Sequence, residues 1–156
     1  MTTPNGTWNE PGTDTAIVTV RIIWGALLFG QVSLLAVAAM GIAQATERGA
    51  PANSVLQIFW INVVLLMVAV PLGYFLRAQC YKRHWQANAI TARGYITGNL
   101  LLLALLEAVS LLGLVAALVN GRLMPTIVPP LAALALLIWN YPTGAALRPD
   151  PPPFAR

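Results

Sequence analysis

Residues 93–120 read RGYITGNLLLLALLEAVSLLGLVAALVN, a long apolar run that contains one carboxylate, Glu107, near its middle. A helix needs about 20 mostly apolar residues to cross the hydrocarbon core of a bilayer, and this run is longer than that. The sequence therefore predicts a transmembrane helix over residues 94–119 with an ionisable side chain close to its centre. No other long apolar run of the chain contains a carboxylate.

The composition supports a membrane protein. Of the 156 residues, 58% are hydrophobic and only 9% are charged, whereas about a quarter of the residues of a typical soluble domain are charged. So few polar side chains cannot cover a surface that faces water, but lipid accepts apolar side chains on the outside of a helix. The sequence therefore predicts an integral membrane protein in contact with the lipid bilayer.

Polar breaks divide the apolar sequence into four spans, at residues 17–43, 55–76, 94–119 and 124–141. Pro125, Pro129 and Pro130 lie in the first half of the last span and predict that its helix begins late. We expect an all-α fold in which four transmembrane helices form an antiparallel bundle over residues 17–141. A flexible tail, residues 1–16, precedes this domain, and a Pro-rich tail, residues 142–156, follows it.

The basic residues predict the orientation, because Lys and Arg are enriched on the cytoplasmic side of membrane proteins. The ends and loops that fall on one side of the four spans contain Arg48 and Arg122. Those on the other side contain Arg21, Arg77, Lys82, Arg83, Arg93, Arg148 and Arg156. We therefore expect both termini to be cytoplasmic, and we expect the protein to lie in the bacterial inner membrane.

The sequence lacks the residues that several classes of function require. Cys80 is the single cysteine and His84 the single histidine, so no pair has the spacing of a metal site. The sequence contains no Ser/His/Asp or Cys/His set, no Gly-rich phosphate loop after a strand, and no basic stripe with aromatic partners. We expect no enzyme active site, no metal, no cofactor and no nucleic-acid partner.

Glu107 is the main candidate for a functional site. An acidic side chain at the centre of a transmembrane helix costs about 2.5 to 3.5 kcal/mol on insertion scales, and desolvation favours its neutral, protonated form. No Lys or Arg is predicted at its depth, and the polar residues that could lie near it are neutral: Gln31, Ser33, Asn62, Asn99 and Ser110. Such a carboxyl is suited to hold and release a proton or to bind a small cation.

Two other roles for Glu107 stay open. The protonated side chain can donate a hydrogen bond to Gln31 or Asn62 and join two helices, a contact that contributes about 0.6 kcal/mol on average in membranes. The protein is then an accessory or structural subunit of a larger membrane complex. Alternatively, Glu107 pairs with a cation of another subunit.

Two short patterns concern how the helices pack. Gly94 and Gly98 form a GxxxG pattern, which favours close contact between helices of one chain or of two copies. Residues 32–35, VSLL, recur as residues 109–112 in a span of the same direction. Leu-rich spans produce such repeats easily, so this pattern is weak support for an internal duplication.

Residues 103–118, LALLEAVSLLGLVAAL, resemble the carboxylate helix of the proteolipid ring subunit of rotary ATP synthases. That helix has an apolar run, Glu-Ala, a Gly about two turns later, and then Leu-Val-x-Ala-Leu. The resemblance implies that Glu107 is the ion-carrying carboxylate of a homo-oligomer that works against another membrane subunit. The rest of the chain does not match the family.

Overall fold

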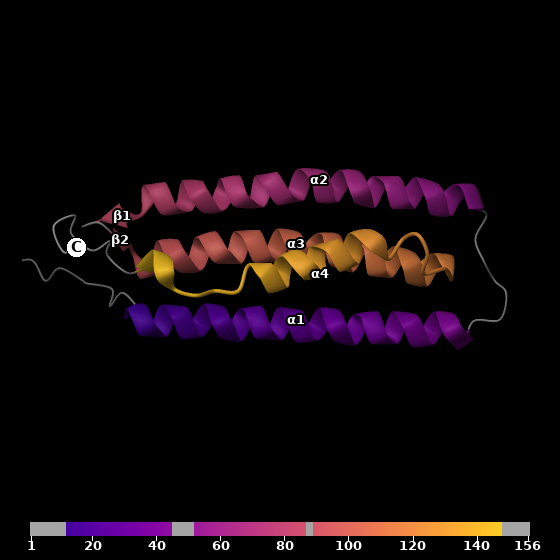
Figure 1. Ribbon diagram of the computed structural model, residues 1–156, viewed down its shortest axis with the longest axis horizontal. Helices are drawn as coiled ribbons and strands as arrows, with labels where there is room; N and C mark the ends of the chain where they lie inside the picture. Colours follow the sequence, from indigo (N-terminus) through magenta and orange to yellow (C-terminus); the bar gives the residue numbers. More distant parts are fainter. Residues whose placement is uncertain (1–11, 45–51, 87–88, 148–156) are drawn as a thin grey trace, which may run out of the picture.

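The computed structural model describes residues 12–44, 52–86 and 89–147 (Figure 1). The helices are α1 Thr13–Gln44, α2 Ala52–Arg83, α3 Ala92–Asn120 and α4 Val128–Trp139, and a 3-10 turn, η1, covers Ala145–Leu147. Two short strands, β1 Trp85–Gln86 and β2 Ala89–Ile90, lie between α2 and α3. Most of the described chain is therefore helical, as the sequence predicts.

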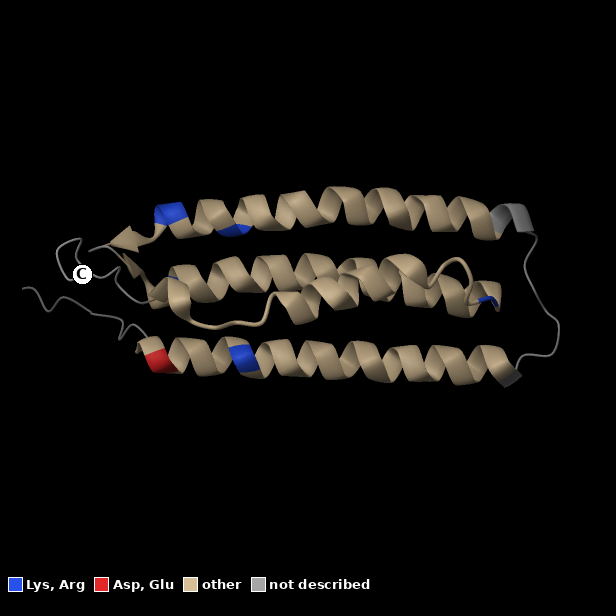
Figure 2. Ribbon diagram, in the orientation of Figure 1, with Lys and Arg blue, Asp and Glu red and all other residues tan. Residues whose placement is uncertain are grey.

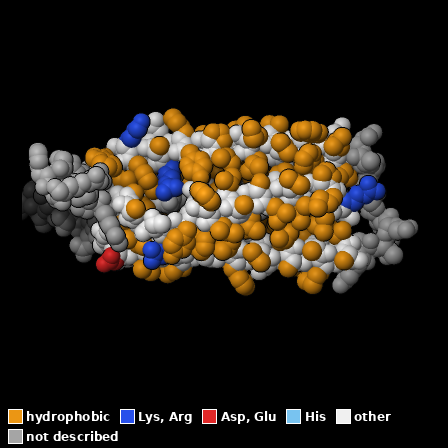
Figure 3. Space-filling view, in the orientation of Figure 1, with side chains coloured by type: hydrophobic (Ala, Val, Ile, Leu, Met, Phe, Trp, Pro, Cys, Tyr) orange, Lys and Arg blue, Asp and Glu red, His pale blue; other side chains and the backbone are white. Residues whose placement is uncertain are grey.

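The central element of the bundle is α3, which packs against each of the other three helices. Figure 1 shows α1 and α2 on opposite sides of the bundle, with α3 and α4 between them. The core includes Leu102, Leu103 and Leu106 of α3, all at most 2% exposed, together with Val20 of α1 and Leu137 of α4. Apolar side chains also cover much of the outer face, as Figure 3 shows, which is the surface expected of a protein that contacts lipid.

Three helices are long and apolar enough to cross a membrane: residues 13–43 of α1, 55–83 of α2 and 92–120 of α3. The predicted all-α architecture is confirmed for these three and, in part, for the fourth. The helix α4 has 12 residues and rises about 18 Å, compared with a hydrocarbon core of about 30 Å. It is thus a shorter apolar helix, where the sequence predicted a span over residues 124–141.

Prolines explain the late start of α4. Its first residue is Val128, and Pro129 and Pro130 follow in the first turn. A proline is tolerated there, because the N–H groups of the first turn have no partner within the helix.

Near the other terminus of the chain, α1 begins at Thr13. The predicted N-terminal tail is therefore helical from that residue, while residues 1–11 lie outside the described part.

The helix α2 continues to Arg83 and α3 begins at Ala92, beyond the predicted spans. Between them the chain forms a two-stranded antiparallel ribbon in which Trp85 is opposite Ile90. This ribbon was not predicted from the sequence. Gly98 lies against Tyr81 of α2, since a Cβ at this position would be 2.8 Å from Tyr81 Cε1. A Cβ on Gly94 would collide with His84. Both glycines of the GxxxG pattern are thus used for close contacts within the chain.

The segment after α4 packs against the bundle, whereas the sequence predicted a tail from residue 142. Pro142, Gly144 and Leu147 are buried, and the segment runs back towards the beginning of α1 and α3 (Figure 1). Here the structure corrects the prediction for residues 142–147. The prediction rested on prolines that prevent a regular helix, but an extended chain can also dock when other side chains bind its backbone.

Side chains of α1 and α3 bind the backbone of this segment. Trp24 Nε1 donates to the carbonyl of Leu137 at 2.8 Å, and Arg21 Nε donates to the carbonyl of Pro142 at 3.1 Å. The Gly144 N–H donates to the hydroxyl of Tyr95 at 3.1 Å. Leu137 belongs to the last turn of α4, whereas Pro142 and Gly144 lie in the segment itself. Non-helical backbone at membrane depth is tolerated where protein groups satisfy it, and the bonds to Pro142 and Gly144 meet that need.

Asn140 ends α4 and connects it to α2. Its Nδ2 donates to the Tyr74 hydroxyl at 2.7 Å and to the carbonyl of Leu136 at 2.8 Å, and its Oδ1 accepts from Arg77 at 3.3 Å. The guanidinium of Arg77 also donates to the Tyr81 hydroxyl at 3.0 Å. A cation at the C-terminus of a helix is favourable, because the helix dipole is negative there.

We expect Tyr95→Phe to destabilise the protein by about 1–3 kcal/mol, because it leaves the buried N–H of Gly144 without an acceptor. Thermal unfolding in detergent measures this loss. Tyr141→Phe is the matched control: Tyr141 is 45% exposed, and its hydroxyl makes no hydrogen bond within the described ranges. Equal melting temperatures for the two variants would show that the bond from Gly144 does not hold this segment in place.

Candidate functional site

Glu107 lies near the middle of α3 and is partly buried. Leu118, eleven residues later, is about three helical turns away and so lies on the same side of the helix. Leu118 approaches α1, because its Cδ2 would be 3.7 Å from a Cβ on Gly41. Glu107 therefore lies on the flank of α3 that borders α1.

The register of α1 and α3 shows which part of α1 is level with the carboxyl. Gln31 shares a pocket with Ser110, and Gly41 approaches Leu118. The two helices run in the same direction, so Glu107 is level with residues 28–30 of α1. Gly30 has no atom within 4 Å of the position that its Cβ would occupy, and α1 therefore leaves open space at this depth.

The Glu107 carboxyl has no hydrogen-bond or ion-pair partner in the part of the chain that the structure describes. The described basic side chains lie towards the two ends of the bundle (Figure 2). We call the end where α1 and α3 begin the basic end; its described basic residues are Arg21, Arg77, Lys82, Arg83 and Arg93, and the opposite end has Arg122. The prediction that no cation of this chain lies at the depth of Glu107 agrees with this arrangement.

Three of the five predicted polar neighbours are engaged elsewhere or face outwards. Asn62 is buried and donates to the carbonyl of Ile58 in its own helix at 3.2 Å. Asn99 donates to the carbonyl of Tyr95 at 2.8 Å and to the hydroxyl of Tyr81 at 2.9 Å. Ser33 is exposed on α1. None of these residues is placed to share a hydrogen bond with Glu107.

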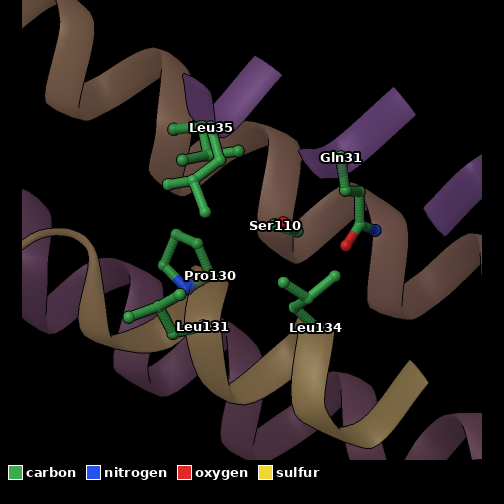
Figure 4. Close-up of a pocket in the computed structure, with 7 residues that line it drawn as sticks. Gln31, Leu35, Ser110, Pro130, Leu131 and Leu134 are labelled. Atoms are coloured by element: carbon green, nitrogen blue, oxygen red, sulfur yellow. The ribbon is translucent and has the colours of Figure 1, made fainter. Parts of the chain in front are cut away.

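The other two predicted neighbours, Gln31 and Ser110, meet in a small pocket between α1, α3 and α4 (Figure 4). Gln31 is 2% exposed and Ser110 is 1% exposed. Neither Nε2 nor Oε1 of Gln31 has a hydrogen-bond partner among the described residues. Since Gln31 Oε1 and Nε2 are both unpaired, the predicted hydrogen bond from Glu107 to Gln31 is absent from this structure.

The apolar wall of this pocket was not predicted from the sequence. The wall consists of Leu35, Leu114, Pro130, Leu131 and Leu134, and the last three come from α4. The prolines of residues 129–130 were identified only as a signal for the start of a helix. In the structure Pro130 also fills the space beside Gly113, because a Cβ on Gly113 would be 2.7 Å from Pro130 Cδ and closer still to Cγ.

The described residues contain no group of three His, Cys, Asp or Glu side chains that could hold a metal ion. The chemistry available near the middle of the bundle is therefore that of one carboxyl, one buried amide and one buried hydroxyl. Comparisons with protein-family models, with curated proteins and with solved structures find no match to the chain.

Proposed function

We propose that this protein is a small integral membrane protein that takes up and releases a proton, or binds a small cation, at Glu107. The observation that carries the proposal is a partly exposed carboxyl in the middle of α3 with no partner among the described residues. An ionisable group is costly at this depth. A side chain that only joined two helices would be expected to make a hydrogen bond that offsets this cost.

The structure favours this role over that of a structural hydrogen bond. The two residues that could accept a hydrogen bond from Glu107 in an accessory subunit were Gln31 and Asn62. Neither shares a hydrogen bond with Glu107 in the described part of the chain: Asn62 donates to the carbonyl of Ile58 in its own helix, and Gln31 has no partner among the described residues. The carboxyl is thus free to exchange a proton or an ion with its surroundings.

We further propose that the protein works as an oligomer that resembles the proteolipid ring subunits. Gly30 of α1, which is level with Glu107, has no atom within 4 Å of the position of its missing Cβ atom, so it is not used for packing within the described part of the chain. Small residues let a second helix approach closely in a membrane. A helix of another copy that packs on α1 at this level would come close to Glu107.

The distribution of charge supports an orientation with the basic end in the cytoplasm. The described part of the chain has five basic side chains at that end and one at the other. Figure 3 shows charged side chains towards the two ends and apolar side chains between them. The proposed setting is an energised membrane such as the bacterial inner membrane, across which a carboxyl can exchange protons.

Labelling with an apolar carbodiimide tests the proposal, because such reagents modify protonated carboxyls in apolar surroundings. We expect an adduct on Glu107 when the protein is held in a lipid nanodisc, and mass mapping of peptides detects it. Asp14, which is exposed in the first turn of α1, is an internal control for carboxyls in water. Glu107→Gln should remove the adduct at residue 107 and leave the extent of labelling at Asp14 unchanged.

If the reagent did not modify Glu107 at any pH, the proposal that its carboxyl is accessible would be wrong. The accessory-subunit role would then become the better explanation, because a carboxyl that is covered by a partner helix cannot react. Suppression of the adduct by Na⁺ but not by choline would identify a bound cation. Suppression by alkaline pH alone would identify a proton.

A further inference from the structure

The small pocket between α1, α3 and α4 contains a buried side-chain amide, that of Gln31, without the hydrogen bonds that such a group needs. Both amide atoms of Gln31 are buried and have no partner among the described residues. Buried polar groups in proteins are nearly always hydrogen-bonded, to protein or to ordered water. An amide left dry and unpaired in this position would destabilise the fold.

The size and shape of the pocket limit what can occupy it. Its volume is about 10 Å³, which is near the minimum that holds a single water molecule. Figure 4 shows the Gln31 side chain directed from α1 into the space between Ser110 and Leu134. The rest of the lining is apolar.

The chemistry of the lining selects among small occupants. The amide of Gln31 has two donor hydrogens and an acceptor oxygen, and the hydroxyl of Ser110 both donates and accepts. A water molecule also does both, so it can bridge these two side chains. A cation would need several oxygen ligands, and the side chains that line the pocket supply only two oxygens, neither of them charged.

We propose that one ordered water molecule occupies this pocket and bridges the amide of Gln31 to the hydroxyl of Ser110. The bridge ties α1 to α3 at the level where α4 closes the pocket. It also places a mobile hydrogen-bonding group about one turn of α3 beyond Glu107, because Ser110 follows Glu107 by three residues. The water site does not depend on any role of Glu107.

Hydroxyl-radical footprinting by X-ray radiolysis tests the proposal, because radicals formed from a bound water oxidise the side chains beside it. The reporter is Leu114, which lines the pocket and is 1% exposed. The matched reference is Leu106, which is on the same helix, is 0% exposed and does not line the pocket. We expect oxidation of Leu114 and none of Leu106 in the intact protein.

Substitutions then connect the oxidation of Leu114 to the bridge. Gln31→Met keeps the length of the side chain and removes its polar atoms, so Leu114 should be oxidised as slowly as Leu106. Gln31→Leu serves if the first variant folds poorly. Asn62→Leu removes a buried amide that is bonded to Ile58, and it should leave the oxidation of Leu114 unchanged.

Three results would overturn the proposal. The first is a Leu114 that is as inert as Leu106 in the intact protein, which would mean a dry pocket. The second is unchanged oxidation of Leu114 in the Gln31 variants, which would mean that water reaches it by another route. The third is a melting temperature that rises with Na⁺ relative to choline and loses this response in Gln31→Met, which would mean that a cation occupies the pocket.

Discussion

If Glu107 takes up a proton as proposed, we expect Glu107→Gln to abolish proton uptake in the middle of the bundle. In infrared spectra of the protein in lipid vesicles, the carbonyl band of a protonated carboxyl should respond to bulk pH in the wild type. The pH-dependent band should be absent from the Glu107→Gln variant, because the side-chain amide of Gln does not take up or release a proton as the bulk pH changes. Glu107→Asp should keep a weaker band, since the shorter side chain retains the carboxyl at a shifted position.

This experiment can separate function from folding. Glu107 has no hydrogen-bond partner within the described residues, so Glu107→Gln should leave the melting temperature close to that of the wild type. A pH-independent carbonyl band in the wild type would show a carboxyl that is permanently protonated and plays a structural part. A band that persists in Glu107→Gln would show that another carboxyl is responsible.

The second large effect is on stability, and we expect it from Gly113→Ala. A Cβ at residue 113 would be 2.7 Å from Pro130 Cδ and closer still to Cγ, and the proline ring cannot rotate away as a flexible side chain would. The helix α4 must therefore shift away from α3. Overpacking of this kind destabilises proteins by about 1–3 kcal/mol, which unfolding in mixed micelles of a denaturing detergent measures.

Gly25→Ala is the matched control for this substitution. A Cβ on Gly25 would meet no atom within 4 Å, and Ala favours a helix over Gly by about 0.8–1 kcal/mol. The control should therefore be as stable as the wild type or more stable. If both variants were equally stable, the contact of Gly113 with Pro130 would not be a determinant of the fold.

The helices could be predicted from the sequence because their apolar runs are long and their ends are marked by polar residues. Gly121 follows α3 with a φ of 64°, a left-handed conformation that suits glycine at the end of a helix. Pro129 and Pro130 indicated the late start of α4. The position of the segment after α4 could not be predicted, because it depends on bonds from Arg21 and Tyr95, which are far away in the sequence.

The rotation of each helix about its axis was the second feature that the sequence did not contain. Ser33 and Ser110 occupy equivalent positions in the repeated VSLL pattern, yet Ser33 is exposed and Ser110 is 1% exposed. In a soluble helix the polar face indicates which side is outward. In a helix that is apolar all round this signal is missing, so the meeting of Gln31 with Ser110 depends on tertiary packing.

The dependence of the last segment on α1 has a consequence for biogenesis. The 12 residues of α4 are fewer than the roughly 20 that cross a bilayer, so this helix is a weak stop-transfer signal. The carbonyls of Leu137 and Pro142 find their donors on Trp24 and Arg21, and in lipid alone they would have none. We therefore expect the last turn of α4 and the segment after it to take up their positions only when α1 already lies beside them in the membrane.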